Sequence, residues 1–189
     1  MSPSDWSASP ETLHGIEFLH WLEDSPRIAF DTETTALKPK TGGLRLLQLA
    51  APGKPVVVID MWQLEPEDWD QIKQFFAADE SRHWYAHNAT FDLGWLQQHD
   101  VYPEGMVFCT MLASRLLENG IPNVRNGLAP ACKRYLNFEV SKEEQASDWS
   151  KPELSESQKT YAANDVRVLL HLAQKVTDLL FSRRLYRAW

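Results

Sequence analysis

The sequence predicts an α/β domain in which helices cover the faces of a mixed β-sheet. Three short apolar runs come first, at residues 27–30, 44–50 and 55–59, and turn-forming residues bound them, as is typical of strands. Two further short runs, at residues 83–86 and 106–108, alternate with segments of helical periodicity. Strands that come first and then alternate with helices are typical of a mixed sheet with helices on its faces.

The first three strands are expected to be consecutive and antiparallel, and the helices come before, between and after the strands. Thr12 is expected to cap a first helix that ends at Glu23, since the apolar residues between them recur at helical spacing. The last helix opens with Ser155 and Gln158, three residues apart, in the pattern of a capping box. The helices predicted after the first cover residues 65–78, 88–98, 110–117, 128–136 and 155–184.

The composition is that of one globular domain. With 189 residues, 43% of them apolar, the chain is long enough to bury a sizeable core. We expect one domain over residues 1–189, with a loose tail at residues 1–10, which are rich in serine and proline. Two cysteines give neither a disulfide framework nor a zinc spacing. Without a signal peptide or a membrane-length apolar run, the chain is expected to be cytoplasmic.

The formal net charge of -7 argues against non-specific wrapping of nucleic acid, which normally requires a basic surface. An enzyme that grips one strand end in a local groove remains compatible with this charge. A cluster of carboxylates that binds metal ions would itself contribute part of the negative charge, and bound divalent cations would offset it locally.

Three short acidic motifs follow one another in a fixed order along the chain. Each contains two polar residues whose spacing places both on one face: two apart in a strand, or four apart in a helix. If the three faces converge, they form an oxygen-rich pocket with four negative charges. The pairs, in chain order, are Asp31 with Glu33, Asn88 with Asp92, and Tyr161 with Asp165.

Four converging carboxylates require cations, because they would otherwise repel one another. Oxygen ligands select hard ions such as Mg²⁺ or Mn²⁺, and two such ions about 4 Å apart form the clamp used for phosphodiester hydrolysis. The expected ligands are Asp31, Glu33, Asp92 and Asp165. A tyrosine has an ordinary pKa of about 10, so Tyr161 is expected to orient the attacking water as a phenol.

Each motif alone also has a plain structural interpretation. Asp31 and Glu33 would be solvated acids where a strand ends. Asn88 would cap a helix and Asp92 would be exposed, while Tyr161 would lie half in the core beside a surface acid. The ordered set of motifs, with the flanking segments described next, favours catalysis over these separate interpretations.

The motifs resemble those of the DEDDy 3′→5′ exonucleases, a family that includes ribonuclease D and the proofreading domain of family A DNA polymerases. A tyrosine four residues before the last aspartate is the mark of the y subgroup; the h subgroup has a histidine five before it, where this chain has Thr160. Other segments are similar to ribonuclease D-like domains. The residues that carry the resemblance are 30–35, 87–92 and 161–165, together with 45–49, 110–117 and 142–149.

The resemblance implies an RNase H-like fold and the release of nucleoside 5′-monophosphates from single-stranded 3′ ends, with RNA favoured. It also implies that the four carboxylates hold two metal ions. Thr34 and Leu37 would contact the terminal nucleotide, with Leu37 as an apolar wedge, although a leucine just after a strand is as often a core residue. Asn88 would position the substrate near the scissile phosphate.

Two features depart from the family. Cys109 stands where many relatives have an acidic residue, which is not a metal ligand in the family. Ribonuclease D also continues into helical HRDC domains, whereas this chain stops at Trp189 directly after the exonuclease domain. That difference makes an RNA substrate less certain and predicts weak, distributive binding.

Three alternatives stay open. The first is a DNA-directed exonuclease, since RNA and DNA share the phosphodiester and differ in the 2′-hydroxyl. The second is a nucleic-acid-binding module that has lost catalysis, which the intact acids and tyrosine argue against. The third is a structural divalent-ion site, which predicts stabilisation by Mg²⁺ without nuclease activity.

Several residues near the motifs have both a structural and a functional interpretation. For Trp149 we expect packing rather than base stacking, and for His87 a satisfied core contact rather than a role with substrate or metal. Basic residues that would line a phosphate groove are, by default, solvated. They are Lys38, Lys40, Arg45, Arg125, Lys133 and Arg134, with Arg183, Arg184 and Arg187 at the C-terminal end.

Overall fold

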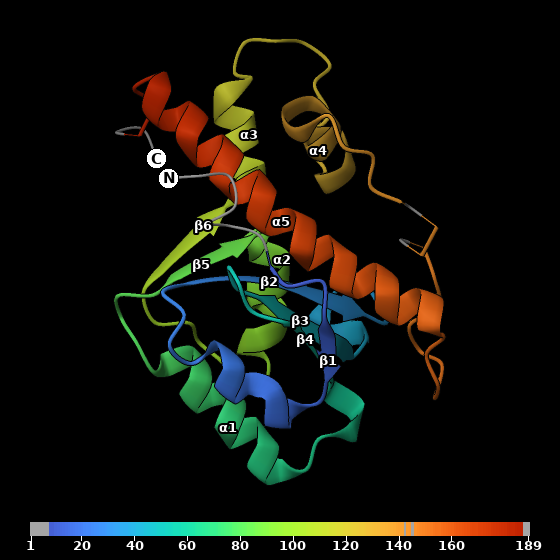
Figure 1. Cartoon of the computed structure of the whole chain (residues 1–189). Helices are drawn as coiled ribbons and strands as arrows, with labels where there is room; N and C mark the ends of the chain where they lie inside the picture. The colour runs from blue at the N-terminus through green and yellow to red at the C-terminus, as the bar shows by residue number, and fades with distance from the viewer. Residues whose placement is uncertain (1–7, 142, 145, 187–189) are drawn as a thin grey trace.

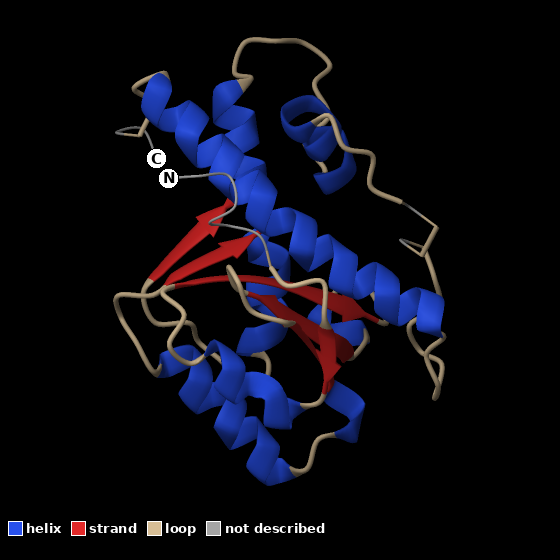
Figure 2. Ribbon diagram, viewed as in Figure 1, coloured by secondary structure: helices blue, strands red, loops and turns tan. Residues whose placement is uncertain are grey.

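A computed structural model describes residues 8–141, 143, 144 and 146–186. Their strands form one six-stranded mixed sheet with helices on both faces, which confirms the predicted fold class (Figures 1 and 2). The strand order is β1-β4-β3-β2-β5-β6. The strands are β1 (Thr12–His14), β2 (Arg27–Thr34), β3 (Leu44–Ala50), β4 (Val56–Asp60), β5 (His83–Ala86) and β6 (Met106–Cys109).

The sheet combines an antiparallel half with a parallel half. Strands β2, β3 and β4 are consecutive and antiparallel, as predicted. Strands β5 and β6 lie parallel to one another, with β5 parallel to β2, and β1 pairs in parallel with β4. The central strand β2 therefore has an antiparallel neighbour on one side and a parallel neighbour on the other.

The helices begin and end within two residues of their predicted bounds, apart from the first. The capping box is present, since Ser155 and Gln158 exchange hydrogen bonds between side chain and backbone at 3.2 and 3.0 Å. The helices are α1 (Pro66–Ala77), α2 (Ala89–Gln97), α3 (Thr110–Leu117), α4 (Leu128–Leu136) and α5 (Glu156–Ser182), with 3₁₀ turns η2 (Ile16–Leu22), η3 (Pro39–Thr41) and η4 (Met61–Gln63).

The predicted helix from Thr12 to Glu23 is wrong in its first turn, because Thr12 lies in strand β1. The exposed edge of β4 accepts this strand as a partner, which no local pattern in the sequence records. Gly15, with φ of 137°, then turns the chain into η2, and a positive φ of this size favours glycine.

The expected loose tail at residues 1–10 is wrong for residues 8–10, while residues 1–7 lie outside the described part of the chain. The amide of Ser9 donates to the carbonyl of Lys54 at 2.8 Å. The guanidinium of Arg167 donates to the carbonyls of Ser9 and Pro10 at 3.4 and 3.2 Å. These bonds fix the segment against helix α5.

The sheet separates two apolar cores. One lies under α5, which crosses the sheet with α3 and α4 packed against it, and the other lies under η2, α1 and α2 (Figure 1). Successive residues of β2 enter opposite cores: Ala29 packs on the α5 side, and Phe30 packs with Phe76 and Trp84 on the other. The acidic residues that follow Phe30 continue this alternation.

No helix in the described ranges has both the length and the apolar character needed to cross a membrane.

Candidate active site

The central strand β2 presents the first two acidic side chains. The strand continues to Thr34, so the prediction that it ends where Asp31 begins is wrong. Asp31 pairs with Gln48 of β3, and Glu33 pairs with Leu46. Because side chains alternate along a strand, both acids point to the face that carries Ala29, which is the face covered by α5.

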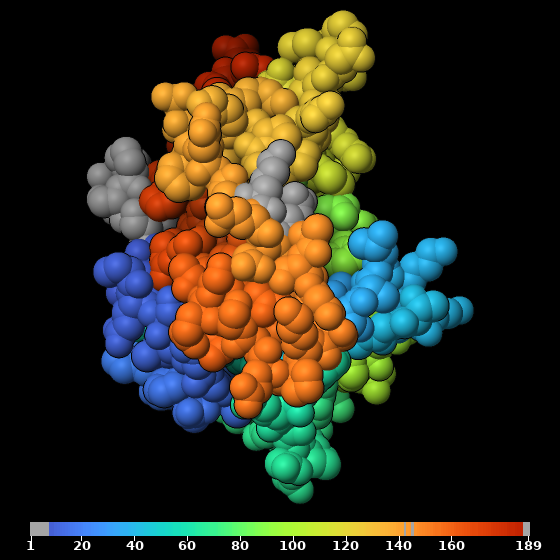
Figure 3. All heavy atoms as spheres, turned by 90° about the vertical axis from the view of Figure 1, so that its right-hand side faces the viewer, coloured from blue at the N-terminus to red at the C-terminus, as the bar shows by residue number. Residues whose placement is uncertain are grey.

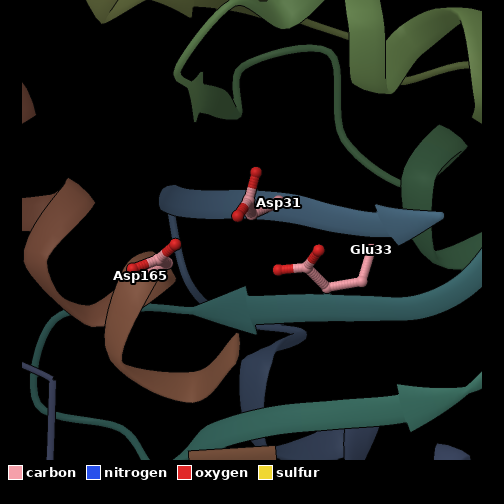
Figure 4. Close-up of side chains that lie close together, drawn as sticks. All are labelled: Asp31, Glu33 and Asp165. Carbon is pink, nitrogen blue, oxygen red and sulfur yellow. The ribbon is translucent and has the colours of Figure 1, made fainter. Parts of the chain in front are cut away.

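The third acidic side chain comes from helix α5. One carboxylate oxygen from each of Asp31, Glu33 and Asp165 lies within 4.8 Å of the others. Figure 4 shows the three side chains close together, two from β2 and one from the helix beside it. Three of the four predicted ligands thus gather at one point although they are far apart in the sequence.

The fourth acid, Asp92, lies in the first turn of α2 and is not part of this group of three. Its side chain is 1% exposed, which excludes the alternative of an exposed surface acid. The Oδ1 atom of Asp92 accepts a hydrogen bond from the Thr32 hydroxyl at 2.6 Å. The charge of Asp92 nonetheless raises the pKa values of Asp31 and Glu33, so it acts on the same site.

Thr32 is a site residue that sequence reasoning missed. It lies between Asp31 and Glu33 but points to the opposite face of β2, where helix α2 begins. The tripeptide from Asp31 to Glu33 therefore supplies two acids on one face of β2. Through the Thr32 hydroxyl it also holds a third acid, Asp92, on the other face. The available signal was a hydrogen-bonding residue at the alternate position of the acidic motif.

Burial and mutual repulsion raise the pKa of every acid in the cluster. Burial is the largest cause of the shift for Glu33, and the negative charges of Asp165 and Asp92 add to it, so that its pKa is raised to about 9. Burial raises the pKa of Asp92 to about 7 and that of Asp165 to about 6. The pKa of Asp31 is also raised well above its ordinary value, first by burial and then by Asp92. At neutral pH the cluster therefore retains protons unless cations replace them.

The acids fit a divalent cation. Within the described part of the chain, Oδ2 of Asp92 and Oδ1 of Asp165 are buried without a hydrogen-bond partner. A buried carboxylate oxygen without a partner is costly, and a hard cation with oxygen ligands removes that cost. The donor set is all oxygen, which suits Mg²⁺ or Mn²⁺ better than a softer metal ion.

Tyr161 lies one turn before Asp165 on α5, and its hydroxyl hydrogen-bonds to the Asp165 carboxylate. Burial raises the pKa of Tyr161 above its ordinary value, and the negative charge of Asp165 raises it further. The side chain is consequently a phenol at neutral pH, as predicted. Trp149 is 5% exposed, with its ring centroid 6.5 Å from that of Tyr161, which confirms the expected packing role.

The three predicted substrate contacts lie at the end of β2, in the loop after it and just before α2. Thr34 ends β2, and its hydroxyl donates to the carbonyl of Ala36 at 2.8 Å. Leu37 is 85% exposed, so its interpretation as a core residue is wrong and its side chain is free to meet a ligand. Asn88 precedes α2 with φ of 68° and makes no side-chain capping bond, so the alternative interpretation of Asn88 as a side-chain cap is wrong.

His87 and Arg45, two side chains near the motifs, have structural roles. Both ring nitrogens of His87 have partners, the Thr110 hydroxyl and the Asn126 carbonyl, each at 2.9 Å, and burial lowers the pKa to about 4. This confirms the satisfied core contact. Arg45 does not line a surface groove, because it is buried and pairs with Asp60 at 3.0 Å.

A cavity of about 900 Å³ borders the cluster along α5. Tyr161 and Asp165 line it at one side, and Phe138 and Val168 are among the apolar residues that line the remainder. These two site residues therefore lie between the carboxylates of β2 and an open space large enough for part of a substrate.

Comparison with known protein families identifies the class of protein that combines this sheet with this acidic cluster. A family model described as 3′-5′ exonuclease, named for family A DNA polymerases, matches residues 15–180. The chain belongs to this 3′-5′ exonuclease family, which confirms the resemblance carried by the three motifs.

Individual relatives share most of this chain. DNA polymerase I from Aquifex aeolicus is 34% identical over 159 residues, which are 84% of this chain and 25% of the relative. Ribonuclease D from Haemophilus influenzae is 31% identical over 158 residues, which are 83% of this chain and 38% of the relative. The chain thus spans well under half of the length of each of these relatives.

Among solved structures, Brucella melitensis NrnC bound to pGG superposes with a TM-score of 0.74 at 26% identity. The similarity covers 93% of this chain and 84% of the NrnC chain. This coverage is much more even than with the two longer relatives.

Proposed function

We propose that this protein is a metal-dependent 3′→5′ exoribonuclease similar to ribonuclease D. It would release nucleoside 5′-monophosphates from the 3′ ends of single-stranded RNA. The observation that carries the proposal is the convergence of carboxylate oxygens from Asp31, Glu33 and Asp165 within 4.8 Å of one another. A cluster of this kind, in a member of the 3′-5′ exonuclease family, is best explained by metal-assisted phosphodiester hydrolysis.

In this proposal Asp31, Glu33, Asp92 and Asp165 hold two divalent cations, Mg²⁺ or Mn²⁺. The buried, unpartnered oxygens of Asp92 and Asp165 support it, as does the Brucella melitensis NrnC structure with bound Mg²⁺, which is 28% identical with a TM-score of 0.70. Bound cations would supply charge stabilisation for the attacking and leaving oxygens of the phosphodiester. Without them, the raised pKa values leave part of the cluster protonated at neutral pH.

The remaining site residues orient the reactants. Tyr161 stays protonated, so its hydroxyl holds the attacking water in line by hydrogen bonding rather than removing a proton from it. Leu37, exposed in the loop after β2, provides the apolar wedge against the terminal base. Thr34, at the end of β2, contacts the same nucleotide. Asn88, whose amide makes no capping bond, is available to the substrate.

Two relatives support RNA as the substrate. Ribonuclease D from Haemophilus influenzae is 31% identical, and NrnC was solved with pGG bound. The alternative is a 3′→5′ exodeoxyribonuclease, and the 34% identity with DNA polymerase I from Aquifex aeolicus favours it. The two substrates differ only in contacts to the 2′-hydroxyl, so the choice between them requires a matched comparison.

The test uses 5′-labelled single strands of RNA and DNA with the same sequence, each with Mg²⁺, Mn²⁺ or EDTA. We expect a ladder that shortens from the 3′ end, requires the metal and is faster on RNA. Asp31→Ala should abolish it. Asp24→Ala, which removes an exposed acid outside the cluster, should leave it intact.

The outcomes of this test distinguish the proposed function from its alternatives. Faster degradation of DNA than of RNA would make DNA the substrate and leave the proposed mechanism unchanged. Absence of cleavage on both strands, with the metal still bound, would overturn the enzyme proposal in favour of a binding module or a structural ion site.

A further inference from the structure

One aromatic side chain near the site is held in place yet half exposed. Trp62 lies in η4, directly after strand β4, and 48% of its surface is accessible. The carboxylate of Asp60 accepts a hydrogen bond from the Trp62 amide at 3.1 Å and so fixes the start of η4. The side chain therefore occupies a defined position at one end of the sheet.

The strand register places Trp62 near the carboxylates. Glu33 of β2 pairs with Leu46 of β3, and Leu46 pairs with Asp60 of β4. Asp60 is thus level with Glu33 two strands away, which corresponds to about 10 Å. Trp62 follows Asp60 by two residues, at the same end of the sheet as Thr34.

A buried arginine supports the inner face of the Trp62 ring. The Arg45 guanidinium lies 4.4 Å from the ring centroid. Arg45 is itself fixed, by an ion pair with Asp60 at 3.0 Å and a hydrogen bond to the Pro152 carbonyl at 3.1 Å. The Trp62 ring therefore packs against a guanidinium whose position is fixed, while about half of the side chain stays accessible.

The loop at residues 35–43 borders Trp62. Its ends are joined, since the Thr35 amide donates to the Gly43 carbonyl at 3.0 Å and the Gly43 amide donates to the Thr35 hydroxyl at 2.8 Å. A Cβ atom on Gly43 would lie only 3.4 Å from Nε1 of Trp62, so the loop base and the indole are in contact.

The same loop carries positive charge into solvent. Its segment projects from the surface in the space-filling view, in light blue (Figure 3). Lys38 and Lys40 are exposed, and neither forms an ion pair with any residue in the described ranges. The loop that carries these two cations adjoins Trp62 at its base. An exposed aromatic ring together with unpaired cations is the combination that binds single-stranded nucleic acid, through base stacking and phosphate contacts.

We propose that Trp62 is a stacking platform for a nucleobase upstream of the terminal nucleotide, with Lys38 and Lys40 beside the adjoining phosphates. The proposal rests on the proposed exonuclease function and adds a determinant of strand length to it. Asp60 lies about 10 Å from Glu33, which corresponds to about three stacked bases at 3.4 Å each, and Trp62 follows Asp60 by two residues. A dinucleotide bound at the carboxylates would not reach Trp62, whereas a longer strand would.

The experiment compares KM and kcat for a dinucleotide and for a longer single strand with the same 3′ end. Trp62→Leu keeps an apolar cover over Arg45 but removes the aromatic face, and Trp62→Phe retains that face. We expect Trp62→Leu to raise the ratio of KM for the longer strand to KM for the dinucleotide about 5- to 100-fold, with kcat little changed. Trp62→Phe should restore most of the ratio.

The matched control is Trp21→Leu, because Trp21 is also a half-exposed tryptophan, at 46%, but lies in η2. It should leave both KM values as in the wild type. An equal rise of both KM values in Trp62→Leu would show a structural role and overturn the platform, and an unchanged ratio would overturn it as well.

Failure of the proposed function is recognised separately. If the wild type cleaves neither substrate, the affinity for the longer strand is measured in EDTA by fluorescence anisotropy. A loss of affinity in Trp62→Leu, restored in Trp62→Phe, would retain the platform on a protein that binds without cleaving. Equal affinities of the three proteins would overturn the platform.

Discussion

At the scale of single residues, the tripeptide from Asp31 to Glu33 organises both sides of the sheet. Its two acids point toward α5, where they meet Asp165. Its middle residue, Thr32, points toward α2 and donates to Asp92 at 2.6 Å. Since Asp92 has no second partner for Oδ2 in the described structure, Thr32 is the group that sets the direction of this carboxylate.

The role of Thr32 predicts the effect of its removal. Thr32→Val keeps the shape of the side chain but deletes the donor, so Asp92 loses its orientation. We expect a 10- to 100-fold loss of metal affinity or activity, the range typical when a group that orients a metal ligand is lost. Titration of Mn²⁺ by calorimetry measures the affinity. Thr32→Ser retains the hydroxyl and should stay within a few fold of the wild type; an unaffected Thr32→Val would contradict the assignment.

The role proposed for Tyr161 is of a different kind, since it would orient the attacking water rather than bind the metal. Tyr161→Phe deletes the hydroxyl that bonds to Asp165 while leaving the carboxylates in place. We expect the single-turnover cleavage rate to fall roughly a hundredfold, within the range for loss of a group that positions or transfers a proton. Stabilisation by Mn²⁺, measured as a shift in Tm, should be retained. Tyr102→Phe, at an exposed tyrosine, is the control.

At the scale of elements, helix α5 is the part on which the site depends most. It carries both Tyr161 and Asp165, and its packing covers the face of β2 that presents the other acids. Its start is fixed by the capping box of Ser155 and Gln158, six residues before Tyr161. The cap therefore bears on the position of the tyrosine as well as on stability.

The capping box leads to a stability prediction. Ser155→Ala removes the side-chain acceptor for the Gln158 amide and should cost about 1 kcal/mol, the usual loss for such a cap. For a chain of this length that lowers Tm by about 2–4 °C in a thermal scan. Ser182→Ala, at the other end of α5, removes an exposed serine hydroxyl and should change Tm by much less. Equal shifts in the two variants would argue against the cap.

Elements with strong local signals were predictable from the sequence. The bounds of α3 and α4 agree with the prediction at both ends, since apolar periodicity and flanking Gly and Asn residues mark them. Strand β2 was predicted too short, because Asp31 and Glu33 have low strand propensity and only pairing with β3 keeps them extended. Strand β1 was missed because its pairing with β4 depends on an edge formed by distant residues.

The site, too, was predictable where local geometry determines a feature and unpredictable where long-range packing does. Spacing alone predicted which carboxylates share a face, because the periods of strand and helix are fixed by local geometry. The burial of Asp92 and its bond to Thr32 depend on where α2 docks on the sheet, which spacing does not encode. The exposed position of Leu37 likewise depends on the path of the loop after β2.

At the scale of the whole molecule, the acidic cluster lowers the stability of the metal-free protein as pH rises. The folded-state pKa of Glu33, about 9, lies above its unfolded value of about 4.3, and Asp92 and Asp165 are shifted in the same direction. Between these values the folded state binds more protons than the unfolded state. Its stability is therefore full at low pH and is lost as the pH rises through the folded-state pKa values.

This linkage predicts a falling Tm between pH 7 and pH 9 in the absence of metal. The window lies above the range in which His87 titrates, since burial lowers its pKa to about 4. Glu33→Gln removes one of the titrating groups, so it should raise Tm near pH 9 and flatten the decrease. Addition of Mg²⁺ or Mn²⁺ should also reduce the decrease in the wild type. A pH dependence identical in Glu33→Gln and wild type would contradict the coupling.

The joined ends of the loop at residues 35–43 have a consequence for how such enzymes diversify. Two hydrogen bonds between Thr35 and Gly43 close the loop at its base, so its length affects little beyond it. Doubling the length of a flexible loop costs only about 0.6 kcal/mol of closure entropy. A one-residue slip in β2, by contrast, would turn its acids to the wrong face. The loop can therefore change in length at small cost to the fold, which would alter the contacts of Leu37, Lys38 and Lys40 with the nucleic-acid strand while β2 keeps its acids on the same face.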